Sequence, residues 1–487
     1  MLKDEKVIRL IFGFKVRHFR QQKGFSYQEL SDRTGLSTSY LNDIEKGKRY
    51  PKPDKINLLA KAFDSDYNHL VSIGSSKKLK PIIDLLTSKF FRLFPLDLFG
   101  ISLEKLLELF SQTPDKVNAF ISTIFRIARN YQVDEDRFYK EALRSFQDMH
   151  DNHFPELDES ADNFKTEFSL KDELDPEYLE EQLEEIYGIS VNKLSLSDQN
   201  NFKGIRSYFN PDKKILFLKN NLETSQQNFL IAREIGFQYL GLEERPFETT
   251  ISQVNSFEKL LNNYKASHFA AALLMNSNSL VKDIRQFCQE NKWQPDLFLT
   301  FIEKYNVSPE TFMQRLTNIL PKPLGIEDLF FIRLNGNPEQ HKFNMTKDLH
   351  LSQLHSPYNN ELNEHYCNRW ISITLLQELN NRKNKTLMAD AQISKYWNTD
   401  KEYLCITIAK PAFEEKDKLV SVTIGLLVTP QLKGLVHFLK DPNLKYREVH
   451  TTCERCGILN CESRVAEPNI INEKESTASL LKELKEL

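Results

Sequence analysis

Residues 7–73 carry the start and stop signals of one short helix after another, and this pattern constrains the fold more than any other part of the chain. Ser26 and Glu29 have the spacing of a capping box, which opens a helix. Gly35 and Gly47 follow helical stretches and suit the left-handed turn that ends a helix. The pattern predicts five helices, at 7–23, 27–34, 38–46, 56–63 and 64–71. We therefore place a five-helix domain at residues 1–74.

The third predicted helix has the properties of a helix that reads DNA. Leu41 and Ile44 are apolar and face the core, whereas the first turn presents short hydrogen-bonding side chains. Such a helix end enters the major groove, where Asn, Ser and Thr read base edges and nearby side chains hold phosphates. The alternative is an interaction module that binds no DNA. The predicted DNA-binding residues are Tyr27, Gln28, Ser37, Thr38, Ser39, Tyr40, Asn42, Lys46, Lys48 and Arg49.

The distribution of charge along the chain agrees with one nucleic-acid-binding end. Residues 1–74 carry 14 Lys and Arg against 9 Asp and Glu, whereas residues 151–200 carry 15 Asp and Glu against 3 Lys. A basic end on an acidic body is typical of proteins that meet nucleic acid at one end. A solvated acidic linker explains residues 151–200 equally well. We expect a helical connector with this acidic segment over residues 75–165.

Length and composition bound the compartment and the number of domains. A chain of 487 residues has room for several domains. No stretch approaches the ~18 uncharged apolar residues that a membrane span needs. The first six residues lack the order of a signal peptide, and six cysteines are too few for a disulfide scaffold in a chain this long. We expect a cytoplasmic protein with no membrane partner.

Residues 166–290 form the next predicted domain. Residues 206–209 and 215–218 alternate like two strands around the turn at Asn210, and a helix follows at 228–240. This order is similar to the IrrE/ImmA-type peptidase-like family, which carries a zinc-binding H-E-x-x-H on that helix. The two histidine positions hold Arg233 and Phe237, and the family's downstream carboxylate falls near Asn263. The resemblance implies a degenerate zincin-like α+β domain that is not an enzyme, with Glu234 as a structural or ion-paired carboxylate.

The C-terminal third, residues 291–470, has the pattern of an α+β domain that holds small molecules. Stretches at 328–334, 402–409 and 419–428 read as strands, with helices between them. Cys453, Cys456 and Cys461, spaced C-x2-C-x4-C, put three thiols within reach of one metal centre. Cys367 is the best candidate for a fourth ligand. The spacing leaves open zinc, an iron–sulfur cluster or thiols without metal, and residues 471–487 form an amphipathic tail.

Two resemblances extend this interpretation. The stretch from Ser26 to Pro51 resembles the XRE family of lambda-repressor/Cro-like helix-turn-helix domains, which implies double-stranded operator DNA as a partner. The order of all three parts resembles the short-chain fatty acyl transcriptional regulator family (RamB/PrpR-like XRE regulators). The residues that carry this second resemblance are Cys367, Trp370, Cys453, Cys456, Cys461, Arg464, Ala466 and Pro468.

The second resemblance implies an effector and a cofactor. The effector is coenzyme A (CoA) or a short-chain acyl-CoA, and the cofactor is a 4Fe–4S cluster on the four cysteines, with zinc as the alternative. The resemblance also implies a homodimer or homotetramer. Arg369 and Arg464 lie beside these cysteines and are predicted to contact the ligand, the alternative being ion pairs with local glutamates.

We therefore predict a multidomain protein that is mainly α-helical in its N-terminal half and ends in an α+β sensor domain. Its predicted function is that of a DNA-binding transcriptional regulator that responds to an acyl-CoA. The alternative is a repressor or antitoxin-type DNA-binding protein with a structural zinc, controlled by redox state or by a protein partner.

Overall fold

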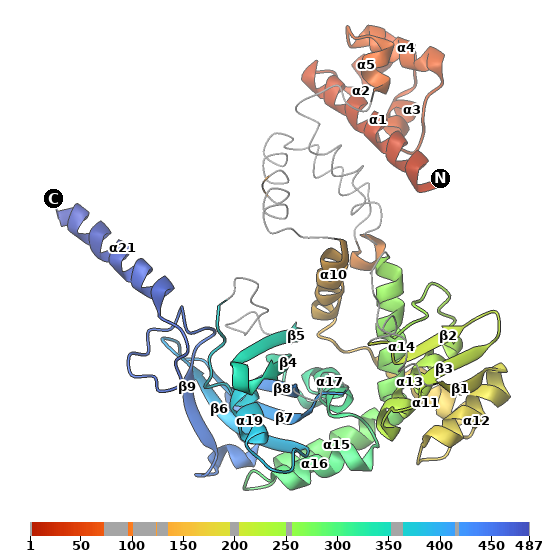
Figure 1. The fold of residues 1–487 in the computed structure, drawn as a ribbon. Helices are drawn as coiled ribbons and strands as arrows, with labels where there is room; N and C mark the ends of the chain where they lie inside the picture. The colour runs from red at the N-terminus through yellow and green to blue at the C-terminus, as the bar shows by residue number, and fades with distance from the viewer. Residues whose placement is uncertain are drawn as a thin grey trace. The chain divides into compact units, whose positions relative to one another are not determined.

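The computed structural model describes residues 2–72, 96–100, 123, 135–194, 204–249, 256–351, 364–413 and 418–486. The chain divides into two compact units, Met1–Phe146 with Ser252–Leu260, and Gln147–Ile251 with Leu261–Leu487. Each unit is described here by itself (Figure 1). Much of the predicted connector, namely residues 75–95, 101–122 and 124–134, lies outside the described residues. The predicted multidomain α+β architecture is confirmed.

The N-terminal part of the first unit contains the five predicted helices. They are α1 (Leu2–Gln22), α2 (Tyr27–Thr34), α3 (Thr38–Glu45), α4 (Pro53–Ala62) and α5 (Tyr67–Val71). The capping box of Ser26 and Glu29 is formed, and Gly35 ends α2 in the left-handed conformation. The first helix begins at Leu2 rather than at residue 7, and the third ends at Glu45. The unit also contains η1 (Leu96–Phe99) and most of α10 (Glu135–Met149).

Gly13 allows α1 to lie directly against the end of α3. A Cβ atom added at Gly13 would stand 2.2 Å from the carbonyl oxygen of Ile44, which is too close for any real contact. The close approach buries Phe12 and Val16 of α1 in one core with Leu41 and Ile44 of α3. The position of α3 is therefore fixed by backbone contact as well as by apolar packing.

The second unit begins with a small sheet flanked by helices. Its elements are α11 (Pro155–Glu167), α12 (Pro176–Tyr187), β1 (Ser190–Leu194), β2 (Ser207–Asn210), β3 (Ile215–Lys219), α13 (Thr224–Tyr239) and the greater part of α14 (Phe257–Leu274). The strand order is β1-β3-β2. The β2–β3 pair is antiparallel, as the sequence predicts, whereas the parallel partner β1 was not predicted.

Four further helices lead to the large sheet. They are α15 (Ser277–Cys288), α16 (Pro295–Lys304), α17 (Pro309–Ile319) and α18 (Pro321–Leu324). Three of them, α16, α17 and α18, begin with a proline in the first turn, a position where the missing N–H costs no helical hydrogen bond. Ser308 caps α17 by accepting a hydrogen bond from the Thr311 N–H at 3.1 Å. This cap fixes the first turn of α17, which borders the pocket described below.

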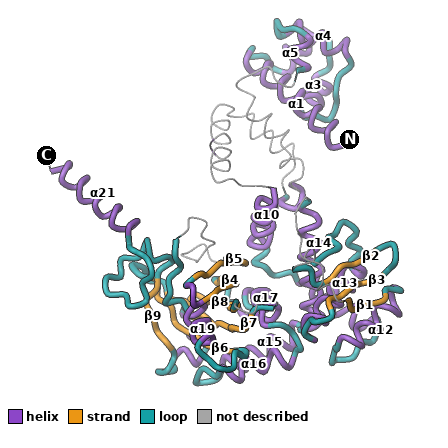
Figure 2. The backbone as a smooth tube through the Cα atoms, in the orientation of Figure 1, coloured by secondary structure: helices purple, strands orange, loops and turns teal. Residues whose placement is uncertain are grey.

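The large sheet has six strands in the order β5-β4-β8-β7-β6-β9 (Figure 2). They are β4 (Leu329–Asn337), β5 (Lys342–His350), β6 (Met388–Tyr396), β7 (Glu402–Pro411), β8 (Leu419–Leu427) and β9 (Lys445–Val449). All neighbouring strands are antiparallel except β6 and β9. The predicted strands correspond to β4, β7 and β8, while β5, β6 and β9 were not predicted. The short elements η3 (Pro338–Gln340), α20 (Pro430–Leu435) and η4 (His437–Lys440) lie in its connections.

The two parts of the second unit share one apolar core. The same cluster of buried residues contains Ile231 of α13, Phe312 of α17 and Ile424 of β8. Helix α19 (Ile371–Asn380) packs on β6, β7 and β8. The final helix α21 (Asn469–Glu486) leaves Leu480, Leu481 and Leu484 exposed. Within the described ranges, no helix is both long and apolar enough to cross a bilayer.

Candidate functional site

The exposed N-terminal turn of α3 is the candidate DNA-reading surface. Leu41 and Ile44 are buried, as predicted, so the opposite side of the helix is left for contacts. Ser37 accepts a hydrogen bond from the Tyr40 N–H at 3.2 Å and so caps the helix. The predicted contact residues Gln28, Ser37, Thr38, Ser39, Lys46, Lys48 and Arg49 are exposed, and Tyr27, Tyr40 and Asn42 are half-buried. None of the predicted DNA-binding residues is fully buried, and all of them lie in the N-terminal helical domain.

One of the predicted DNA-binding residues, Tyr27, has its hydroxyl engaged inside the domain. It donates to a carboxylate oxygen of Glu45 at 2.7 Å. Arg20 of α1 pairs with the same carboxylate at 2.6 Å and stands 4.1 Å from the Tyr27 ring. Burial and the bond to Glu45 raise the pKa of Tyr27. Arg20, Tyr27 and Glu45 join α1, α2 and α3, and so fix the orientation of α3 relative to the other two helices.

The positions that correspond to a zinc-peptidase motif come together in space but hold the wrong donors. Arg233 of α13 contacts Asn263 of α14, from Nη1 to Oδ1, at 3.5 Å. The guanidinium carbon of Arg233 lies 6.0 Å from the centre of the Phe237 ring. A guanidinium and a phenyl ring cannot ligate zinc. These residues therefore do not fit a zinc ion.

Glu234, the one motif residue that is present, is ion-paired as predicted. Arg245 reaches its two carboxylate oxygens at 2.6 and 2.5 Å. The side chains are 6% exposed for Arg245 and 3% for Glu234. Arg245 also lies 3.6 Å from the centre of the Phe237 ring. A carboxylate held in this way has both oxygens occupied by a permanent cation.

Arg233 has only neutral neighbours within hydrogen-bonding distance. Besides Asn263, it donates to the Ser207 hydroxyl at 3.3 Å. Among the described residues no carboxylate pairs with it, since Glu234 is bound to Arg245. The residue is 8% exposed, and burial lowers the pKa of its guanidinium to about 10. In the part of the chain that the structure describes, Arg233 is thus a buried cation with no carboxylate within ion-pair distance, although the charge of Glu234 acts on it.

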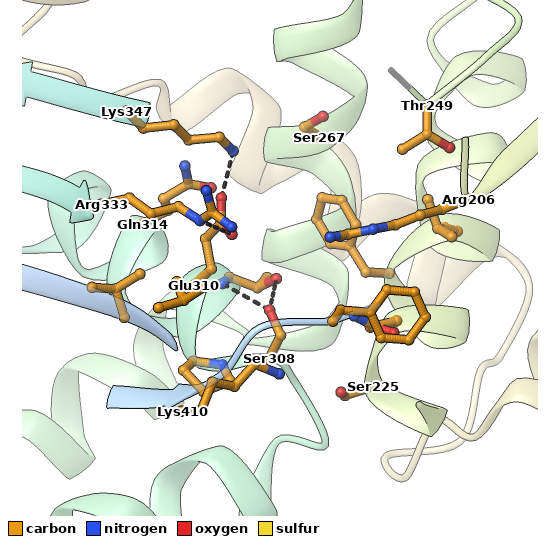
Figure 3. Close-up of a pocket in the computed structure, with 18 of the residues that line it drawn as sticks. Arg206, Ser225, Thr249, Ser267, Ser308, Glu310, Gln314, Arg333, Lys347 and Lys410 are labelled. Carbon is orange, nitrogen blue, oxygen red and sulfur yellow. Dashed lines mark hydrogen bonds and ion pairs between the residues drawn. The ribbon is translucent and has the colours of Figure 1, made fainter. Parts of the chain in front are cut away.

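Arg233 belongs to the lining of a pocket between α13, α14, α17 and the large sheet (Figure 3). We call it the basic pocket, because five of its residues are cationic: Arg206, Arg233, Arg333, Lys347 and Lys410. Its volume is about 250 Å³. Its apolar surface comes from Phe229, Leu230, Ile408, Phe413, Val420 and Val422. The lining therefore combines positive charge with an apolar slot.

Glu310, at the start of α17, is the acidic residue in the lining of the basic pocket. It pairs with Lys347 at 2.5 Å and with Arg333 at 3.1 Å. Figure 3 shows these three side chains together on one wall, with Thr249 and Ser267 across from them. Burial alone would raise the pKa of Glu310, but Lys347 and Arg333 outweigh it and bring the value to about 2. Five cations and one carboxylate leave this pocket with an excess of positive charge.

The cysteines predicted to form the cluster come from two segments far apart in the sequence. A β-bridge joins Tyr366 to Thr452, and the Cys453 N–H donates to the His365 carbonyl at 2.9 Å. This pairing places Cys367 close to Cys453, as the choice of a fourth ligand requires. The cluster thiols of Cys367, Cys453 and Cys456 are buried, and that of Cys461 is half-buried. Burial raises the pKa of Cys367 to about 12.

Four thiols are the donor set of an iron–sulfur cluster or of a structural zinc. The four cysteine side chains therefore have the right chemistry to hold the iron–sulfur cluster or zinc ion that the family resemblance implies. In the part of the chain that the structure describes, no three His, Cys, Asp or Glu side chains stand as close together as metal ligands do. A Cβ atom added at Gly457 would stand 2.4 Å from the Trp397 ring, so that ring would have to move to admit any larger residue. The remaining cysteines, Cys288 and Cys405, are buried core residues, as predicted.

The two arginines predicted to contact the ligand lie outside the lining of the basic pocket. Arg464 donates hydrogen bonds to the carbonyls of Cys453, Cys456 and Ile458 at 3.0, 3.0 and 2.7 Å. It therefore holds the cysteine loop together, and it has no glutamate partner among the described residues. Arg369 is half-buried, and its carbonyl accepts from Gln392 at 3.1 Å.

The residues of the basic pocket were not singled out by the sequence analysis as a ligand site. They are spread from Arg206 to Val422, so no local motif contains them. The sequence offered one signal for this pocket. Arg233 stands where the peptidase family has a histidine, and an arginine there puts a positive charge where the family binds a zinc ion.

Comparisons with known proteins match two parts of the chain. The helix-turn-helix family matches residues 16–70, and the IrrE N-terminal-like domain matches residues 184–317. The chain is 35% identical over 77 residues to the control protein C.BamHI of Bacillus amyloliquefaciens, of which it covers 95%.

Longer matches are found with two regulators of Mycobacterium tuberculosis. The HTH-type transcriptional regulator RamB is 20% identical over 362 residues, covering 70% of this chain and 72% of RamB. The HTH-type transcriptional regulator PrpR is 21% identical over 339 residues, covering 66% of each chain. A solved structure of a Mycobacterium tuberculosis transcriptional regulator aligns with a TM-score of 0.47 at 18% identity, covering 67% of this chain and 93% of that one.

Proposed function

We propose that this chain, which belongs to the helix-turn-helix family of transcriptional regulators, responds to CoA or a short-chain acyl-CoA held in the basic pocket. DNA binding and transcriptional regulation are the established part of this description. The effector, the metal centre and the oligomeric state are the proposal. The relatives RamB and PrpR are regulators, and this supports a sensor role for the C-terminal half.

The observation that carries the proposal is the lining of the basic pocket. An acyl-CoA combines several phosphate charges with a flexible, largely apolar arm that ends in a thioester. Arg333, Lys347 and Lys410 supply cations for phosphates. Phe229, Val420 and other apolar side chains supply a slot for the arm. A volume of about 250 Å³ suits the acyl end of the ligand, with the nucleotide at the mouth.

The absence of peptidase activity is part of the same proposal. Arg233 and Phe237 occupy the positions of the zinc ligands, and Glu234 is bound to Arg245. A general base must be free to take a proton from water, and a carboxylate paired on both oxygens is not. The domain would then serve as one wall of a ligand pocket.

We further propose that Cys367, Cys453, Cys456 and Cys461 hold a 4Fe–4S cluster, with zinc as the alternative. When bound, such a cluster supplies a redox-active or purely structural cross-link. Arg464 supports the proposal because it ties the carbonyls of Cys453 and Cys456 together. We also expect a homodimer or homotetramer, since helix-turn-helix regulators read paired half-sites.

The test is operator binding by the anaerobically purified full-length protein, followed by fluorescence anisotropy on its own upstream DNA. Titrations with acetyl-, propionyl- and butyryl-CoA should shift the operator affinity. Arg333→Gln should retain operator binding without ligand but require at least tenfold more acyl-CoA for the same shift. Lys385→Gln, an exposed lysine outside the pocket, is the matched control and should behave as wild type. Tight operator binding that no acyl-CoA changes would refute the effector and favour control by redox state or a protein partner.

A further inference from the structure

Arg233 carries an inference about the acyl group itself, and it rests on the proposed binding of acyl-CoA in the basic pocket. Of the five pocket cations, Lys347, Arg333 and Lys410 each contact a carboxylate, from Glu310 or Glu223. Among the described residues Arg206 and Arg233 have no carboxylate partner, and Arg206 is only half-buried. Among the described residues, the hydrogen-bond partners of Arg233 are the neutral oxygens of Asn263 and Ser207. At 8% exposure it is also largely removed from water. A buried guanidinium in this situation favours binding of an anion from outside.

We propose that Arg233 binds a carboxylate at the far end of the acyl group, so that the preferred effectors are short acyl-CoAs that end in a carboxylate. Malonyl-, succinyl- and glutaryl-CoA belong to this class. The planar guanidinium presents two parallel N–H donors, which match the two oxygens of a carboxylate. The single positive charge of Arg233 matches the single negative charge of a carboxylate at the end of the acyl chain.

The spacing of side chains on α13 gives the acyl arm a path to Arg233. Gln226, Phe229, Leu230 and Arg233 all line the pocket and stand at helical intervals of three, four and seven residues. An arm that lies along Phe229 and Leu230 reaches Arg233 one turn further along the same face. The polar side chains of Asn263 and Ser267 border this end of the slot from α14.

A phosphate of the ligand is a poorer partner for Arg233. Binding of a CoA phosphate there would bury the nucleotide, the bulkiest and most polar part of the molecule, against Phe229, Leu230 and Val422. Arg333 and Lys347 are better placed for phosphates because they set two cations against the one carboxylate of Glu310, and the Lys347 side chain is 51% exposed. The side of the pocket with Arg333 and Lys347 thus suits a phosphate, and the side with Arg233 suits a carboxylate.

The test is a comparison of dissociation constants for the full-length protein by isothermal titration calorimetry. Each carboxyl-terminated acyl-CoA is paired with the uncharged acyl-CoA of the same carbon number: malonyl with propionyl, succinyl with butyryl and glutaryl with pentanoyl. We expect at least one carboxylate ligand to bind ten or more times tighter than its uncharged partner. Equal affinities within all three pairs would overturn the inference and leave acyl-CoA sensing intact.

Variants assign the preference to Arg233. Arg233→Gln keeps a hydrogen-bond donor near Ser207 and Asn263 but removes the charge, so it should abolish the preference while leaving the affinity for butyryl-CoA within threefold. Arg333→Gln should weaken both members of a pair equally. A preference that persists in Arg233→Gln would overturn the role of this residue. If no CoA compound binds, or if free succinate binds as tightly as succinyl-CoA, the proposed effector is wrong. The wild-type comparison stands even if a variant fails to fold.

Discussion

Glu234 and Arg245 form a two-armed ion pair inside the second unit, with nitrogen–oxygen distances of 2.6 and 2.5 Å. Both side chains are almost completely removed from solvent. The guanidinium carbon of Arg245 also lies 3.6 Å from the centre of the Phe237 ring and 5.0 Å from the centre of the Phe209 ring. A residue type that serves catalysis in a zinc peptidase here holds the α13 helix to the segment that precedes α14.

Loss of this ion pair should destabilise the second unit. Glu234→Gln leaves Arg245 buried without its counter-charge, which we expect to lower the free energy of unfolding by about 3–5 kcal/mol. Urea denaturation followed by circular dichroism measures the change. The double variant Glu234→Gln/Arg245→Met should recover a large part of the loss, because no unpaired charge remains. A single variant as stable as wild type would show that the pair has no such role.

The pocket carboxylate predicts an acid-dependent loss of stability. The pKa of Glu310 is about 2 in the folded protein and 4.5 ordinarily, so the ionised group stabilises the fold above pH 4.5, and this contribution is lost as the pH falls toward 2. The corresponding free energy is about 3 kcal/mol. Urea unfolding between pH 5 and 2.5 should therefore show a steeper loss for wild type than for Glu310→Gln. Parallel pH profiles for the two proteins would contradict the assignment.

Two residues of the DNA-reading domain should differ in what they contribute. Asn42→Ala should reduce discrimination between operator and altered sites by about 1–3 kcal/mol, because an amide on α3 reads a base edge. Lys48→Ala should weaken binding to all sequences and lower the salt slope by about one, because an exposed lysine after α3 contacts phosphate. Anisotropy on operator and scrambled DNA at several salt concentrations separates the effects. Equal loss of discrimination in both variants would refute these roles.

The cysteine cluster predicts a defined pattern of metal loss. Cys456→Ser should remove the bound metal from anaerobically prepared protein, as measured by elemental analysis and by the visible absorbance of iron–sulfur clusters. Cys405→Ala is the matched control, because Cys405 is buried within β7, and it should keep the full metal content. Undiminished metal in Cys456→Ser would show that the ligand set is wrong. Zinc instead of iron in the wild type would select the alternative cofactor.

Local signals along the chain determined the helix-turn-helix domain and led to the prediction of an altered peptidase motif. Ser26, Glu29 and Gly35 start and stop α2 through bonds that span only a few residues, so their meaning is readable without the fold. The spacing of Arg233 and Phe237 likewise placed both on one helix, as the structure confirms, and predicted that they stand at the positions of zinc ligands. The bounds of α1 were less accurate, because its first turn carries no capping pattern.

Only the tertiary structure decided which distant side chains share a pocket or a loop. Arg233 and Lys347 are 114 positions apart, yet both line the basic pocket, because the core that joins α13, α17 and β8 brings their elements together. Arg464 was predicted to contact the ligand, but its guanidinium is used on the carbonyls of the cysteine loop. Periodicity along a sequence reports which face of an element is buried. It does not report which element covers that face, and for this reason the cysteine pattern was visible from the residues alone while the pocket was not.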